Sequence, residues 1–177
     1  TTGFTLIEFD DAPRLFSRPL LPANRPNADK ALAFLKKAKP YGATNIFDSL
    51  EMALSLPQID TIVFLSDGLP NRGRFKDTAS ILREVARMNR HLRIALHCIW
   101  IVPGRSFTAE EWEKGGLPPP GPEELERRRL FRERAADLEL GQFLRRLGQE
   151  NDGSFSVAFA DTYRPPPGAP TRPSTDE

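Results

Sequence analysis

Hydrophobic positions along the chain follow two spacings in turn, and this alternation predicts the order of its elements. Short segments rich in β-branched and aromatic residues predict strands, and continuous apolar runs are typical of strands covered on both faces. The predicted strands are Phe4–Asp10, Thr61–Leu65, Arg93–Val102 and Ser154–Phe159. Apolar positions at helical spacing predict helices near residues 28–38, 46–55, 76–89 and 137–149.

Strands that alternate with helices favour an α/β class, with a doubly wound, mainly parallel sheet between helical layers. We expect the four predicted strands to share this one sheet. Residues 14–21 predict a further strand, antiparallel and at an edge, because Pro19 cannot donate a hydrogen bond within a central ladder. Residues 123–150 predict a long charged helical region that breaks near Gly141.

The length of 177 residues suits one globular domain, and we place that domain at residues 1–162. Prolines cluster in an irregular insertion at about 103–123 and again in the segment 163–177. The second cluster has too little apolar surface to order itself. We therefore expect residues 163–177 to form a disordered, proline-rich tail.

Charge and cysteine usage narrow the range of partners and compartments. The net charge is +1, which gives no electrostatic reason to expect nucleic acid or an anionic membrane as a partner. No apolar run approaches the roughly 20 residues that span a bilayer, and no signal-peptide pattern is present. The single cysteine, Cys98, lies in an apolar run and predicts a buried, inert thiol. The compartment stays unknown, although these features favour the cytoplasm.

Recognisable enzymatic patterns are missing from the sequence. His91 and His97 are the only histidines, and with a single cysteine they argue against a structural zinc site. The sequence holds no nucleophile elbow and no glycine-rich phosphate loop. His97 lies within an apolar strand, which is typical of a core histidine rather than a general base. These observations predict that the chain is not an enzyme.

The candidate chemistry lies in two short motifs at predicted strand–loop junctions. Gly42-Ala43-Thr44-Asn45-Ile46 leads into a helix, and Ser66-Asp67-Gly68-Leu69-Pro70 ends a buried strand. Ligands of open α/β sheets bind beyond the carboxyl ends of the strands. A strand-end carboxylate and a nearby threonine hydroxyl are oxygen ligands that suit Mg²⁺ or Ca²⁺. We expect Thr44 and Asp67 to lie within reach of one cation, with Asn71 and Arg72 in position to contact a ligand.

Each of these residues also has a purely structural interpretation. Either Thr44 or Asn45 would cap the following helix, and Asp67 would open a simple turn. Asp48 would complement the dipole of that helix, and the residues after the second motif would form a solvated loop. The two motifs in this order favour the metal site over the structural interpretation.

The order GxTN, helix, apolar strand and SDGxP resembles the metal-ion-dependent adhesion site of von Willebrand factor A (VWA) domains. The similarity covers about residues 4–102 and 137–159, and the sequence most resembles bacterial members of the family. The resemblance implies a Rossmann-like three-layer fold and a protein-binding module. In such a module Thr44 and Asp67 would hold Mg²⁺ or Ca²⁺, and a partner protein would present a carboxylate to the cation.

One part of the family pattern is absent. The first strand of VWA domains ends in an Asp-x-Ser-x-Ser motif that supplies further ligands, and this chain begins after the place of that strand. The string occurs once, at residues 152–156, but there it precedes a strand, so we regard it as a chance match. Because the missing strand is central in the family, we expect a gap between Phe4–Asp10 and Thr61–Leu65. We also expect marginal stability of the chain and weak cation binding.

Two other functions stay open at this stage. The first is a metal-dependent hydrolase or transferase on a Rossmann-like sheet, with Asp67 as a ligand. It needs a general base or nucleophile near Asp67, and the sequence indicates none. The second is a structural scaffold in which the metal site is vestigial.

Overall fold

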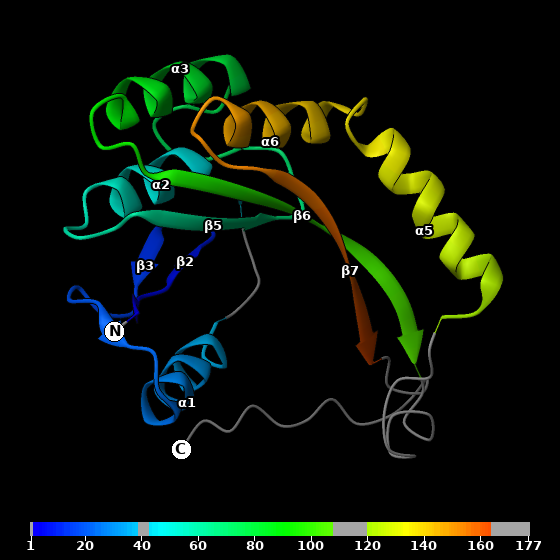
Figure 1. Cartoon of the computed structure of the whole chain (residues 1–177), viewed down its shortest axis with the longest axis horizontal. Helices are drawn as coiled ribbons and strands as arrows, with labels where there is room; N and C mark the ends of the chain where they lie inside the picture. The colour runs from blue at the N-terminus through cyan, green and yellow to red at the C-terminus, as the bar shows by residue number, and fades with distance from the viewer. Residues whose placement is uncertain (1, 39–42, 108–119, 164–177) are drawn as a thin grey trace.

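The computed structural model describes residues 2–38, 43–107 and 120–163 (Figure 1). Gly42 of the first motif, most of the expected insertion and the tail from residue 164 lie outside the described residues. The strands are β1 Gly3–Phe4, β2 Ile7–Phe9, β3 Pro13–Leu15, β4 Leu21–Pro22, β5 Thr61–Ser66, β6 Ala95–Phe107 and β7 Phe155–Tyr163. The helices are α1 Arg25–Leu35, α2 Ile46–Leu54, α3 Thr78–Asn89, α5 Pro122–Ala135 and α6 Glu139–Gln149.

A parallel sheet of three strands, in the order β5–β6–β7, forms the centre of the molecule. Thr61–Ser66 pairs in parallel with residues 95–100, and β7 pairs in parallel along the other edge of β6. Helices α3 and α6 precede β6 and β7, as the crossovers between parallel strands require. The structure therefore confirms a mixed α/β protein with a parallel sheet.

The N-terminal strand does not join this sheet, so the prediction of one sheet for all four strands is wrong. Only Ile7–Phe9 of the expected Phe4–Asp10 strand forms β2, and it pairs antiparallel with β3 in a hairpin. The ion pair of Arg14 with Glu8, at 2.6 Å, joins the two strands. A second antiparallel pair, β1–β4, lies beside it. The physical reason is that β2 pairs with its neighbour in sequence, and no described strand bridges it to β5.

Two boundaries differ from the sequence-based expectation. Strand β6 continues past residue 103 to Phe107, because β7 also continues and pairs with it as far as Tyr163, with an irregularity between Pro103 and Ser106. The break in the C-terminal helical region lies at residues 136–138, before Gly141. Gly141 lies within α6 and does not end a helix. A Cβ there would be 1.7 Å from the Ala135 carbonyl oxygen, so glycine allows the two segments to pack closely.

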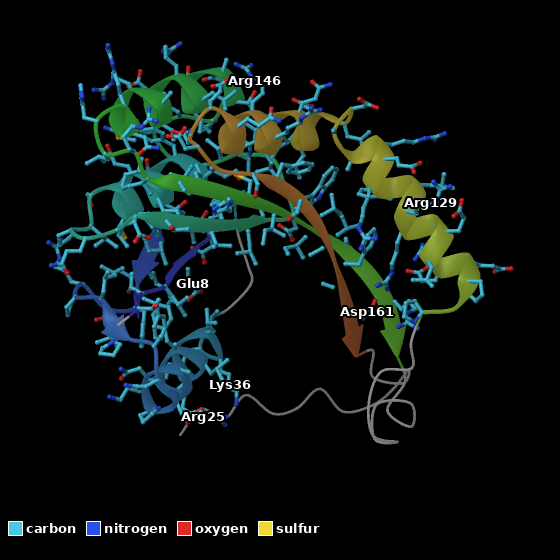
Figure 2. All side chains as sticks on the ribbon, viewed as in Figure 1. Glu8, Arg25, Lys36, Arg129, Arg146 and Asp161 are labelled. Carbon is cyan, nitrogen blue, oxygen red and sulfur yellow. The ribbon has the colours of Figure 1, made fainter. Side chains whose placement is uncertain are left out.

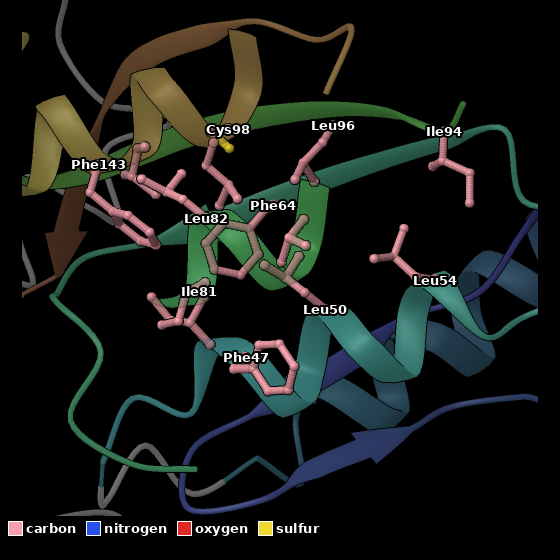
Figure 3. Packing of buried hydrophobic residues seen from close by; sticks show 14 of the residues in the cluster. Phe47, Leu50, Leu54, Phe64, Ile81, Leu82, Ile94, Leu96, Cys98 and Phe143 are labelled. Carbon is pink, nitrogen blue, oxygen red and sulfur yellow. The ribbon is translucent and has the colours of Figure 1, made fainter. Parts of the chain in front are cut away.

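Apolar side chains from α2, α3 and α6 meet one face of the sheet in a single core (Figure 3). Fully buried members of this core are Phe47, Ile46, Leu50, Ile81, Leu96, Leu144, Leu147, Val85 and Cys98. Burial raises the pKa of the Cys98 thiol to about 12, so the predicted buried thiol is confirmed. On the opposite face of β5, Val63 and Leu65 are 56% and 49% exposed.

Helix α5 contacts the far end of the sheet through rings and ion pairs rather than through a broad apolar face. Phe131 packs edge-on against Trp100 and Phe159. Arg128 reaches Asp161 at 2.5 Å and Glu124 at 2.6 Å, and its guanidinium also lies over the Phe159 ring. Figure 2 marks Asp161 near the end of β7, on the side where α5 begins. No helix among the described residues is long and apolar enough to cross a membrane.

Candidate functional site at the carboxyl end of β5

A groove of about 720 Å³ runs between β2 and β5. Its β5 wall is a strand edge that no other strand of the described residues pairs with. The Ala95 N–H donates to the Asp60 carbonyl at 2.9 Å. In a parallel pair only every second residue of a strand bonds to its partner strand, so this bond shows which residues of β5 bond to β6. The backbone groups of Thr61, Val63 and Leu65 therefore face away from β6, toward the groove.

The opposite wall of the groove is also a strand edge. The Phe16 N–H donates to the Leu6 carbonyl at 2.9 Å, and this register turns the backbone groups of Ile7 and Phe9 away from β3. Residues of β2 and α2, among them Leu50, line the groove together with β5. The Phe9 and Phe64 rings stack with centroids 5.4 Å apart. The groove lies where the sequence predicts a gap, between the Phe4–Asp10 and Thr61–Leu65 segments.

The two sequence motifs meet at the carboxyl end of this groove. The Thr44 N–H donates to the Asn71 side-chain oxygen at 2.7 Å, and the Asn71 N–H donates to the Thr44 carbonyl at 3.2 Å. These bonds join the loop before α2 to the loop after β5. The Thr44 hydroxyl oxygen lies 3.6 Å from where a Cβ of Gly68 would be, and Thr44 and Asp67 both line the groove. The structure therefore brings the two predicted residues to one end of the sheet.

The Thr44 hydroxyl and the Asp67 carboxylate form no hydrogen bond or ion pair with the described residues. The cap of α2 is Asn45, whose side chain accepts from the Asp48 N–H at 3.3 Å, so Thr44 is not needed for capping. Asp67 is exposed. The hydroxyl oxygen of Thr44 and the carboxylate of Asp67 are thus both available to bind an added group at this end of the groove.

Asn71 and Arg72 have different roles in this geometry. The side-chain oxygen of Asn71 is occupied by the Thr44 N–H, so Asn71 positions the two loops. Arg72 lies 3.6 Å from the Asp11 carboxylate, and both side chains are more than half exposed. Exposed ion pairs of this kind contribute at most about 1 kcal/mol. The guanidinium of Arg72 can therefore exchange Asp11 for an external carboxylate at little cost.

Sequence reasoning missed Asp10 as a residue of the site, and it placed Gly73 on the loop after Asp67 without predicting its packing role. Asp10 lines the same groove as Asp67, and its carbonyl accepts from the Asn45 N–H at 3.0 Å. An acid at the end of a predicted strand was a signal for this position, but the residues that follow it are typical of an ordinary turn. Gly73 has φ of 91°, and a Cβ there would lie 2.0 Å from the Asn45 side-chain oxygen. Only glycine lets this loop approach the cap of α2.

The donor set fits a hard cation that keeps part of its water shell. Thr44, Asp67 and Asp10 offer oxygen atoms only, which suits Mg²⁺ or Ca²⁺ better than zinc. Within the described ranges, no group of three or more His, Cys, Asp or Glu side chains could hold a metal. A cation at this place would therefore need further oxygen ligands from water, a partner or another strand.

The other candidate residues lie away from this site. The Asp-x-Ser-x-Ser string at 152–156 opens β7, at the amino end of the sheet, as the sequence indicates. Its Asp152 pairs with Arg93 at 3.1 Å. The predicted core histidine, His97, is only partly buried, because its ring reaches Ser154 at 2.8 Å near the edge of the sheet.

Comparison of the sequence with protein-family models gave no match, and comparison with curated proteins gave none either. The functional argument therefore rests on the geometry of the groove and its two loops.

Proposed function

We propose that the chain is a protein-binding module of the VWA type, with a doubly wound fold, and that it is not an enzyme. A divalent cation, Mg²⁺ or Ca²⁺, would be held by Thr44 and Asp67, with Asp10 beside them. The cation would supply an open coordination position that accepts a carboxylate from a partner protein. The observation that carries the proposal is that the Thr44 hydroxyl and the Asp67 carboxylate, at the carboxyl end of one groove, bond to no other described residue.

The groove supports the second part of the proposal, which concerns the remaining ligands. Its two walls are strand edges with free backbone groups, and an inserted strand would pair with both. A strand parallel to β5 would end beside Thr44 and Asp67. An Asp-x-Ser-x-Ser motif at that end would complete the oxygen shell. Without it, two or three protein oxygens give weak cation binding.

Arg72 supports the choice of a carboxylate as the partner group. Its guanidinium lies on the loop after Asp67 and holds only an exposed acid. A partner carboxylate that binds the cation would meet this positive charge next to it. The proposal therefore assigns Arg72 to partner binding and Asn71 to positioning the loop.

Magnesium titration by calorimetry tests this function. The chain is extended at its N-terminus with a strand that ends in Asp-x-Ser-x-Ser, and Mg²⁺ binding is compared with that of the 177-residue chain. We expect the extension to strengthen binding at least about tenfold, which corresponds to about 1.4 kcal/mol. Asp67→Ala in the extended chain removes this gain.

Asp60→Ala is the matched control, because Asp60 lies exposed at the amino end of the same strand. It removes the same charge but leaves Mg²⁺ binding unchanged. Equal Mg²⁺ binding by the Asp67→Ala variant and its parent would refute the metal site. Strengthened binding without any need for Thr44 would refute the assigned ligand set.

A further inference from the structure

The outer edge of β7 is a second free strand edge, and its surroundings differ from those of β5. Within the described part of the chain, β7 pairs with β6 alone. The Cys98 N–H donates to the Ser154 carbonyl at 2.7 Å, which sets the alternation of this ladder. The backbone groups of Phe155 and Val157 consequently face outward, where another strand can pair with them.

A shallow groove of about 610 Å³ lies along this edge. Its lining consists of Arg132, Ala136, Arg145, Gln149, Gly153, Ser154, Phe155, Ser156 and Val157. The residues come from the ends of α5 and α6 and from the first part of β7. The lining therefore holds two arginines and no acid.

These two arginines differ in their partners from four other arginines of the same helices. Arg127, Arg128, Arg129 and Arg146 on the same helices each pair with a glutamate. Arg132 and Arg145 form no ion pair with the described residues. Arg132 instead lies over the Phe159 ring, 5.1 Å from its centroid, and this contact keeps its guanidinium beside β7.

We propose that this edge binds an extended acidic segment of a partner protein as a fourth strand of the sheet. The backbone of the segment pairs with Phe155 and Val157. Alternate side chains of the added strand point to the face that carries α5 and α6, where Arg132 and Arg145 lie. The partner segment consequently carries glutamate or aspartate at every second position. Small or polar residues between them lie beside the exposed Ser154 and Ser156.

This surface is separate from the groove between β2 and β5, so the two proposals succeed or fail independently. The two grooves share no lining residue, and β6 separates β7 from β5. The charge also differs, because the edge of β5 faces the apolar side chains of β2 and α2.

The probe is an end-capped eight-residue peptide with glutamate and threonine at alternating positions, titrated into the 177-residue chain. Amide chemical shifts report where it binds, and we expect them to move at Phe155 and Val157 but not at Val63 and Leu65. Affinity falls as salt rises, because exposed charges are screened within about 8 Å at physiological ionic strength. A peptide with lysine in place of glutamate does not bind.

The double variant Arg132→Glu and Arg145→Glu lowers the affinity for this peptide at least about tenfold, a loss of about 1.4 kcal/mol. Arg146→Glu is the matched control, because Arg146 lies on the side of α6 away from the sheet (Figure 2). It leaves the affinity within about twofold, because Arg146 does not line the groove and pairs with Glu150 instead. Circular dichroism checks the fold of each variant, and a milder double variant with glutamine at both positions replaces one that is misfolded.

Three outcomes overturn the proposal: shifts confined to Val63 and Leu65, equal binding of the lysine peptide, or no binding of either peptide. In the last case, self-association of the double variant would show that the two arginines only guard a free edge.

Discussion

The parallel sheet with its helices and the N-terminal segment of residues 2–35 are built in different ways. The sheet and helices α2, α3 and α6 enclose a core with many fully buried side chains. In residues 2–35, Ala31 is the only buried residue, and each strand has two or three residues. The N-terminal segment is therefore ordered by its contacts with the sheet and α2, of which Phe9 on Phe64 is the most apolar.

This difference places the candidate site at a boundary. Asp10 belongs to the weakly packed segment, whereas Thr44 and Asp67 belong to the well-packed part. The bonds of Asn45 to the Asp10 and Asp11 carbonyls, both at 3.0 Å, connect the two parts. The candidate site therefore combines residues from both parts of the molecule.

The largest expected effect breaks the well-packed part. Leu144→Ala removes a fully buried side chain at the centre of the core and lowers the free energy of unfolding by about 2–5 kcal/mol. Leu32→Ala, in α1, removes a side chain that is 54% exposed and changes it by less than about 0.5 kcal/mol. Urea denaturation of both variants measures the contrast. Similar losses would show that the two parts are equally packed.

A smaller effect is expected from weakening the contact between the N-terminal segment and the sheet. Phe9→Ala removes the ring that stacks on Phe64, and we expect a loss of about 1–2 kcal/mol because Phe9 is only partly buried. The amide of Asn45, which donates to the Asp10 carbonyl, exchanges its hydrogen faster in this variant.

Phe4→Ala provides the comparison, because Phe4 is also partly buried but lies in β1, outside the core cluster. It leaves the exchange of the Asn45 amide unchanged. Faster exchange in both variants would assign the effect to general loosening of the segment.

The smallest effect concerns the far end of the sheet, where α5 is held by charge. Burial acts to raise the pKa of Asp161, but hydrogen bonds from Arg105 and Arg128 outweigh it and hold the pKa below its ordinary value. The Arg128 hydrogen bond likewise lowers the pKa of Glu124. A lowered folded-state pKa stabilises the fold fully above the ordinary carboxyl pKa of about 4, and this stabilisation is lost as the pH falls through the folded-state value.

We therefore expect α5 to detach from the sheet in acid before the core unfolds. The indole NMR signal of Trp100, which packs on Phe131, reports the detachment. Arg128→Gln shifts this transition to higher pH. An acid transition of Trp100 that coincides with that of the core, with and without Arg128, would contradict independent docking of α5.

The sequence predicted the well-packed part better than the N-terminal segment. The continuous apolar runs of β5 and β6 and the alternating pattern of β7 are typical of strands, and apolar residues at helical spacing predicted α2, α3 and α6. The pairing of β2 could not be predicted, because strand-forming residues do not specify which edge they meet. The break at residues 136–138 was misplaced because Gly141 serves close packing there and not helix termination.

At the candidate site, the meeting of the two loops could be predicted because consecutive strand–helix junctions of a parallel sheet share one edge. The role of Asn71 could not, since its side chain serves a backbone group 27 residues earlier in the chain. Asp10 was missed for the same reason, because its place in the groove depends on the docking of a separate hairpin. That Thr44 and Asp67 hold a cation stays a prediction, which the magnesium titration tests.

The burial of Cys98 makes its alkylation a measure of how often the core opens. With a pKa of about 12, roughly one thiol in 10⁴ is ionised at pH 8, and only the thiolate is a nucleophile. Cys98 is also only 1% exposed in the folded state, within the core to which α2, α3 and α6 contribute. Alkylation therefore requires these helices to open, and its rate reports how often the core opens. Because the sequence has one cysteine, every labelled molecule records the same event.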